Sequence, residues 1–161
     1  MKLDAAHRFT APGDEVCDAM GDPEFYATLR LPDVEPPEVI VRTAVGTRVD
    51  VHVRFTYIGK LDPIARRIVG HDHVSWVQRL EIDRASQSCT LHVMPEIGVM
   101  PVTCRGTFVL HETAPGSLRT LAGELRIRVP IIGGRAEKSL APGIMRRLDL
   151  EAEALDRFLA G

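Results

Sequence analysis

The sequence predicts an α+β domain in which a curved antiparallel sheet of about seven strands packs against one long C-terminal helix. Three observations predict it. Apolar and polar residues alternate in several runs between residues 49 and 129, as in strands with one buried face. Turn signals such as Pro115-Gly116 separate these runs, which favours sequential antiparallel pairing. Residues 136–159 carry apolar side chains at spacings of three and four, as in an amphipathic helix.

The N-terminal part predicts a strand followed by two short helices. Residues 2–10 form the strand. Pro12 is suited to the first turn of a helix, and Gly21 ends that helix. Asp22-Pro23 then supplies an N-cap and a first-turn proline for a second helix, which ends before Pro32.

The strands begin near residue 39, where the apolar period changes from helical to two. A strand over residues 39–44 precedes the most regular run, whose inward row is Val49, Val51, Val53, Phe55 and Tyr57. A small helix over residues 63–69 follows. Further inward rows lie within residues 74–82, 89–93, 102–110 and 121–129. Gly106 and Gly123 fall in the middle of two of these rows, where they either leave volume for a cavity or mark β-bulges.

The C-terminal helix has a continuous apolar stripe, and the open face of the sheet is its available partner. The stripe consists of Ala136, Leu140, Ile144, Leu148, Ala152, Leu155 and Leu159. Pro142-Gly143 falls inside it. Because proline removes a helical hydrogen bond and clashes with the preceding turn, we expect a kink or a break there. All of residues 1–161 are expected to form a single domain.

Composition excludes several classes of protein. The chain has 161 residues, 45% of them hydrophobic, and a net charge of −2, which argues against disorder and against a basic nucleic-acid binder. Arginine outnumbers lysine 17 to 3, which we interpret as the codon bias of a GC-rich bacterial genome. Three cysteines without paired spacing predict free, buried thiols in a reducing cytoplasm. Neither a signal peptide nor a membrane-spanning segment is expected.

Two segments carry a resemblance to a known family. Residues 64–70, followed by a strand with Val74, Trp76 and Gln78, resemble an actinobacterial family of unknown function in the START-like (SRPBCC) superfamily. Residues 129–138, which contain Pro-Ile-Ile-Gly-Gly and lead into the last helix, are similar to the same family. The resemblance implies the helix-grip fold, in which the sheet wraps around the long helix. It also implies a cavity between sheet and helix that holds a small hydrophobic or amphipathic molecule, such as a lipid or polyketide-like compound.

The residues expected to line that cavity share the inward parity of the strands or the apolar stripe of the last helix. They are Val51, Val53, Phe55, Tyr57, Trp76, Gln78, Leu80, Leu91, Phe108, Leu125, Ile127, Leu140, Ile144 and Leu148. Gln78 is the most informative, because a buried amide must find partners. It either anchors a ligand head group or bonds to backbone at a strand irregularity. Tyr57 and Trp76 could orient a ligand or fill the core.

Catalytic and metal chemistry find little support in the sequence. No catalytic residue, metal site or cofactor is predicted, because nucleophile elbows and phosphate-binding loops are absent and the alternation puts almost every His, Asp and Glu on the outer face. His71 and His73 share one face of an expected strand, but no further ligand completes a metal site. Arg66-Arg67 and Arg146-Arg147 are interpreted as solvated faces.

Three hypotheses about function remain. The first is binding or carriage of the hydrophobic ligand. The second is an enzyme of the cyclase or aromatase kind, which needs acid or base groups pointing inward. The third is an interaction module that works as a homodimer without a ligand, which needs an extensive apolar patch outside.

Overall fold

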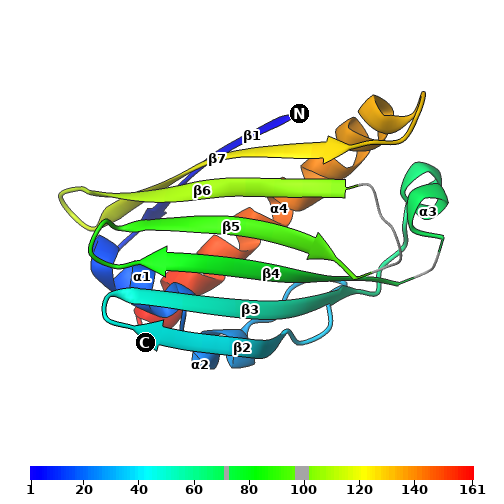
Figure 1. Cartoon of the computed structure of the whole chain (residues 1–161). Coiled ribbons are helices and arrows are strands. Elements are labelled where there is room, and N and C mark those ends of the chain that lie inside the picture. The colour runs from blue at the N-terminus through cyan, green and yellow to red at the C-terminus, as the bar shows by residue number, and fades with distance from the viewer. Residues whose placement is uncertain (71–72, 97–101) are drawn as a thin grey trace.

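The structure, a computed structural model, describes residues 1–70, 73–96 and 102–161. Its elements follow the predicted order (Figure 1). The helices are α1 (Gly13–Met20), α2 (Pro23–Thr28), α3 (Pro63–Val69) and α4 (Gly133–Leu159). The strands are β1 (Lys2–Phe9), β2 (Glu38–Val45), β3 (Arg48–Tyr57), β4 (Val74–Asp83), β5 (Ser88–Pro95), β6 (Val102–Glu112) and β7 (Ser117–Ile127).

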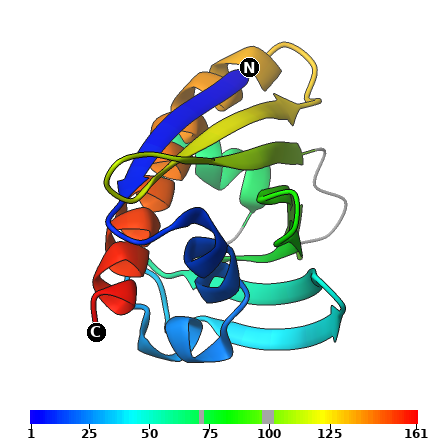
Figure 2. The same ribbon diagram turned by 90° about the vertical axis from the view of Figure 1, so that its left-hand side faces the viewer.

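The strands of the described residues form one antiparallel sheet in the order β1-β7-β6-β5-β4-β3-β2. Sequential strands pair from β2 to β7, and β1 completes the sheet beside β7. The sheet curves, and α4 lies with α1 and α2 on its concave side (Figure 2). The predicted fold class, a curved seven-stranded sheet around a long helix, is therefore confirmed.

Capping residues mark the start of α2 and both limits of α3. Asp22 accepts a hydrogen bond from the backbone N–H of Glu24 at the start of α2. Asp62 does the same for Ala65 at the start of α3. Gly70 ends α3 in the left-handed conformation, which glycine adopts without steric cost.

The last helix runs without a break through Pro142. Of the two expected outcomes at Pro142-Gly143, the break is therefore wrong, and the kink stays a prediction. Both residues are exposed on the outer side of α4, so the proline ring lies in solvent. The apolar stripe on the opposite side continues across them, with Ala141 and Leu148 buried. Packing of that stripe outweighs the lost hydrogen bond.

The two inward glycines form a cross-strand pair rather than two bulges. Gly106 and Gly123 lie directly opposite each other, and the pairing of β6 with β7 runs without a register shift from Val102 to Glu112. A Cβ atom on Gly123 would lie 2.8 Å from the backbone oxygen of Arg105, whereas one on Gly106 would meet the movable end of Leu121. The glycine pair therefore lets the strands approach closely.

We expect Gly123→Ala to lower the free energy of unfolding by about 1–3 kcal/mol, because backbone must move to admit the methyl group. Gly106→Ala is the matched control and should cost less, since the nearest atom is the end of a leucine side chain and the nearest backbone atom lies 3.3 Å away. Chemical denaturation of both variants measures the difference. Equal stability of the two variants would contradict this account.

The core consists of two clusters of buried apolar residues. The larger lies under α1, α2 and the C-terminal half of α4, and contains Phe25, Phe55 and Leu155. The smaller lies under the N-terminal half of α4 and contains Leu125 and Ala136. No helix of the described residues is long and apolar enough to cross a membrane.

Candidate functional site

The backbone of α4 does not approach all strands equally. Within the described residues it packs closest to β7 and β1, and to α1 and α3, and it has no comparable close approach to β3, β4 or β5. The space between α4 and the middle of the sheet is therefore spanned by side chains. This region is where the candidate site lies.

Several side chains in this region face inward yet remain only half-buried. They are Trp76 on β4, Val93 on β5, and Leu140 and Ile144 on α4. Val93 and Ile144 contact both core clusters, so they mark the seam between the two. Apolar side chains on the inner face of a sheet and on the inner stripe of a helix are normally buried completely. The seam is thus a part of the interior that the described residues do not cover completely.

The structure places the fourteen predicted ligand residues in two groups. The half-buried group is Tyr57, Trp76, Leu140 and Ile144. The fully buried group is Val51, Val53, Phe55, Gln78, Leu80, Leu91, Phe108, Leu125, Ile127 and Leu148. All but Tyr57 and Gln78 belong to the two core clusters or pack against them. Their contact with a ligand stays a prediction.

Gln78 lies in a closed polar network beneath α4. Its amide nitrogen donates to Glu151 over 3.3 Å, and its amide oxygen accepts from Arg147 over 2.9 Å. Arg147 also donates to Glu151 over 2.6 Å, one helical turn along α4. The strand pairs regularly with Val53 and Val93 on either side of Gln78. The alternative of a backbone bond at a strand irregularity is therefore wrong, and the partners are side chains of the helix.

Two aromatic rings flank this network. Phe55 and Trp76 stack with their centroids 5.6 Å apart, and the Arg147 guanidinium carbon lies 5.2 Å and 5.7 Å from the two centroids. A cation over aromatic faces is stabilised by their quadrupoles. The buried indole nitrogen of Trp76 has no hydrogen-bond partner among the described residues. It is a donor beside the seam with no acceptor supplied by the described residues.

A second polar group connects β1, β7 and α4. Arg119 donates to Nδ1 of His7 over 3.1 Å, and Nε2 of His7 is 2.8 Å from a carboxylate oxygen of Asp149. Because an arginine can only donate, Nδ1 of His7 must accept, so the proton lies on Nε2 and points at Asp149. Burial of the ring lowers the pKa of His7, and the charge of Arg119 adds to that effect.

These groups correct two expectations. The alternation was expected to put almost every His, Asp and Glu outside, yet His7 and Glu151 are buried. Arg146-Arg147 was expected to be a solvated face, yet the Arg147 side chain is only 11% exposed. The inner space beneath α4 is wide enough that long polar side chains span it, and stacking on Phe55 and Trp76 compensates Arg147 for lost water.

The inward position of Arg119 and His7 was readable from the sequence. Arg119 has the parity of Leu121 and Leu125 on β7, and His7 has that of Leu3 and Phe9 on β1. Both residues are identified by continuing the alternation of inward and outward positions along the two strands. Their proximity to each other requires the pairing of β1 with β7, which joins residues 112 positions apart.

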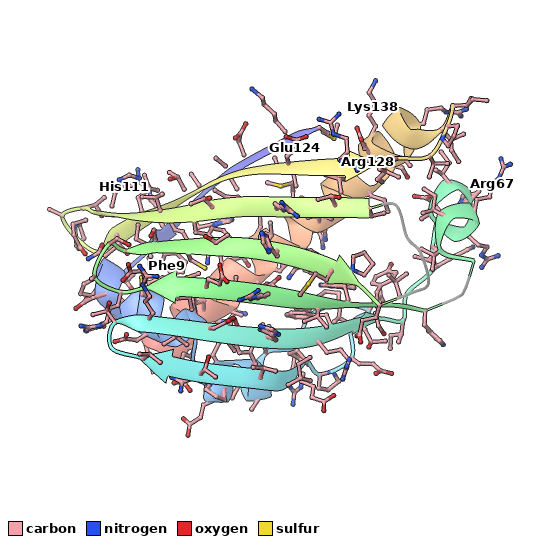
Figure 3. All side chains as sticks on the ribbon, in the orientation of Figure 1. Phe9, Arg67, His111, Glu124, Arg128 and Lys138 are labelled. Carbon is pink, nitrogen blue, oxygen red and sulfur yellow. The ribbon has the colours of Figure 1, made fainter. Side chains whose placement is uncertain are left out.

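His7 predicts a pH dependence of stability. Because burial lowers its pKa below the ordinary 6.5, the unfolded chain binds the proton more readily than the folded one. The contribution of neutral His7 to the free energy of unfolding is therefore fully present above pH 6.5. It is lost as the pH falls towards and through the pKa of the folded state. We expect the loss of Tm between pH 7.5 and 5.5 to be smaller in His7→Gln than in the native chain. His111→Gln, altered at an exposed histidine near the β6–β7 hairpin (Figure 3), is the control and should keep the native loss.

Other candidate features lie away from this site. A hollow of about 880 Å³ beside α3 is lined by Lys60, Leu61, Asp62, Pro63, Arg66, Arg67 and Gly70. Arg67 extends from α3 away from the body of the molecule (Figure 3). A second hollow, of about 460 Å³, lies between β2, β3, β4 and β5 and includes Asp50 and Glu81. None of the predicted ligand residues is among the described residues that line either hollow.

Tyr57 lies at the end of β3 next to the first hollow. Its hydroxyl donates to the backbone oxygen of Lys60 over 3.3 Å, within the turn that leads to α3. The polar end of Tyr57 thus serves this turn.

The described histidines and cysteines assemble no reactive centre. Within residues 1–70, 73–96 and 102–161, no group of three His, Cys, Asp or Glu is arranged to hold a metal ion. His71 lies outside the described residues, and His73 precedes β4, so the expectation that His73 lies on a strand is wrong. Cys17, Cys89 and Cys104 are free and buried, as predicted. Burial raises the pKa of Cys17 to about 11, which keeps its thiol protonated and unreactive.

Comparison with known proteins supports the fold. A family described as "Protein of unknown function (DUF2505)" matches residues 4–159. No curated protein matches. Among solved structures, the protein TTHA0849 from Thermus thermophilus is similar with a TM-score of 0.69 and 19% identity, over 99% of this chain and 97% of that one.

Two further structures are similar over nearly their whole length. The ZhuI aromatase/cyclase from Streptomyces sp. R1128 has a TM-score of 0.65 and 15% identity, over 99% of this chain and 93% of that one. A START superfamily protein from Mycobacterium smegmatis has a TM-score of 0.57 and 14% identity, over 99% and 97%. The helix-grip, START-like fold expected from residues 64–70 and 129–138 is thereby confirmed.

Proposed function

Because the chain belongs to the DUF2505 family of proteins of unknown function, we propose its function from the fold and the site: it binds a small apolar or amphipathic molecule between the sheet and α4. The observation that carries the proposal is the seam, where Trp76, Val93 and Ile144 face inward but stay half-buried. Covering them with an apolar ligand removes their remaining surface from water, at about 25 cal/mol per Å². Similarity to aromatase/cyclase and START structures supports the same kind of site.

The fourteen predicted residues divide naturally under this proposal. Leu140 and Ile144 on α4 and Trp76 on β4 form the entrance to the site, since they are the half-buried members between α4 and the sheet. The fully buried members form the wall against which a ligand packs once α4 moves outward. The proposal includes a cytoplasmic location, with which the free, buried cysteines are in keeping.

Binding of a neutral apolar probe tests the proposal. We expect 1-N-phenylnaphthylamine to bind the native protein with enhanced fluorescence, and Ile144→Trp to weaken binding at least tenfold, because the larger ring fills the seam. Met94→Trp, on the exposed face of β5, is the control and should bind as the native protein does. Failure of the native protein to bind the probe, together with no ligand retained in native mass spectrometry, would reject the proposal.

The enzyme alternative has one specific observation in its favour, which is the buried His7–Asp149 pair. A general base needs a free ring nitrogen to take a proton from a substrate. Both nitrogens of His7 are already occupied, one by Asp149 and the other by Arg119. We therefore favour ligand binding without a reaction.

A homodimer without a ligand is supported less. Among the described residues, the exposed large apolar side chains are scattered, and three of them, Ile40, Val41 and Val45, lie on the edge strand β2. The outer face of β3 and β4 carries ion pairs, including Arg79 with Asp50 at 2.8 Å. A charged face of this kind favours contact with water.

A further inference from the structure

The interior beneath α4 contains more positive than negative charge. Two guanidinium groups are buried there, those of Arg119 on β7 and Arg147 on α4. One carboxylate, that of Glu151, is buried with them. Buried charges in proteins are normally paired, because an unpaired ion loses its hydration without compensation.

Arg147 and Glu151 compensate each other. Their ion pair of 2.6 Å lies within one turn of α4, and Gln78 bonds to both partners. Both oxygens of Glu151 are therefore in use. Within the described residues, neither oxygen bonds to a second guanidinium.

Arg119 has no such partner. Within the described part of the chain, no carboxylate lies within ion-pair distance of it, and its one hydrogen bond goes to His7. His7 supplies no countercharge, because its Nδ1 accepts this bond and its ring is neutral. The buried Nε–H of Arg119 has no acceptor among the described residues. The residue is only 4% exposed, so its guanidinium has little contact with bulk water.

The Arg119 guanidinium is held in the interior by aromatic rings. Its central carbon lies 4.3 Å from the centroid of Phe108 and 5.3 Å from that of Phe9. Phe108 belongs to the predicted ligand wall. Burial lowers the pKa of Arg119, and the negative charge of Glu151 opposes this effect, so the two polar groups beneath α4 share one electrostatic environment.

From this arrangement we infer that the ligand of the interior site is an apolar carboxylic acid, bound as its carboxylate with the Arg119 guanidinium. The inference rests on the proposed function and adds the chemical class of the ligand. A carboxylate accepts the free Nε–H and neutralises the unpaired charge in one step. The ligand body then lies along Phe108 towards the seam. The unpartnered indole N–H of Trp76 offers a second donor to an acceptor-bearing ligand.

Matched pairs of ligands test the inference with the native protein. Dodecanoate is compared with methyl dodecanoate, and 1-naphthoate with methyl 1-naphthoate, by displacement of 1-N-phenylnaphthylamine at pH 7.5. We expect the acid of at least one pair to bind tenfold or more tightly than its ester. Equal binding of acid and ester in both pairs would overturn the inference and leave the proposed function standing. Absence of binding by the probe and by both pairs would reject both proposals.

The variant Arg119→Met tests whether this guanidinium causes the preference for the acid over its ester. The variant should bind acid and ester with equal affinity, and without ligand its Tm should equal or exceed that of the native chain, since methionine fills the space without an unpaired charge. Arg126→Met, at an exposed arginine of the same strand, is the control and should keep the preference for the acid. An Arg119→Met protein that keeps the preference would overturn the assignment. So would a large loss of Tm, because it would show that Arg119 stabilises the empty protein.

Discussion

Glu151→Ala is expected to lower the free energy of unfolding by about 3–5 kcal/mol, which is the usual cost of removing one partner of a buried ion pair. Glu151 accepts from Arg147 and from Gln78, and it is the only buried carboxylate among the described residues. Without it, two guanidinium groups remain beneath α4 with no buried countercharge. Urea denaturation followed by circular dichroism measures the effect.

Two comparisons separate the ion pair from the helix that carries it. Glu153→Ala changes an exposed carboxylate two residues further along α4 and should alter stability by no more than about 0.5 kcal/mol. Replacing the whole network, with Gln78→Leu, Arg147→Met and Glu151→Leu together, should restore much of the stability, because apolar groups of similar volume need no partners. A loss in the triple variant as large as that in Glu151→Ala would contradict this explanation.

The fold was predictable because each part of it leaves a local pattern in the sequence. The alternation from Val49 to Tyr57 predicts β3 with the correct inner face, and the small helix predicted over residues 63–69 is α3. Short turns fix the order of neighbouring strands. None of these inferences requires knowledge of which distant residues meet.

The site was predictable only in part, because its chemistry depends on contacts between distant residues. Gln78 was recognised as a buried amide in need of partners, but its partners are 69 and 73 residues away. Arg147 has the helical spacing of an ordinary surface pair with Glu151. The pair faces inward because α4 lies far enough from the middle of the sheet for these long side chains to fit between them. Pro142 shows the same limit, since local propensity predicted a kink or a break, and tertiary packing overrides the break.

Substitutions at Pro142 and Gly143, inside the uninterrupted helix α4, are expected to stabilise the protein, whereas Glu151→Ala destabilises it. We expect Pro142→Ala with Gly143→Ala to raise the free energy of unfolding by about 2–4 kcal/mol. Alanine at 142 restores the N–H that proline lacks, so the carbonyl of Lys138 regains its helical partner. A Cβ atom on Gly143 meets nothing within 4 Å, and both positions are exposed, so neither substitution disturbs packing.

The same variant connects the helix to ligand exchange. Leu140 and Ile144 lie on either side of Pro142-Gly143 and are half-buried at the seam. Under the proposed function, we expect a ligand to enter when this part of α4 moves. A helix without the weak point should open less often, and stopped-flow dilution should show slower release of 1-N-phenylnaphthylamine than from the native protein. Gly134→Ala, in the first turn of α4 where a Cβ also meets nothing, is the control and should change neither stability by more than about 1 kcal/mol nor the release rate. If the double variant were less stable than the native chain, α4 would depend on a bend at Pro142, and the weak point would be part of how the helix fits the sheet.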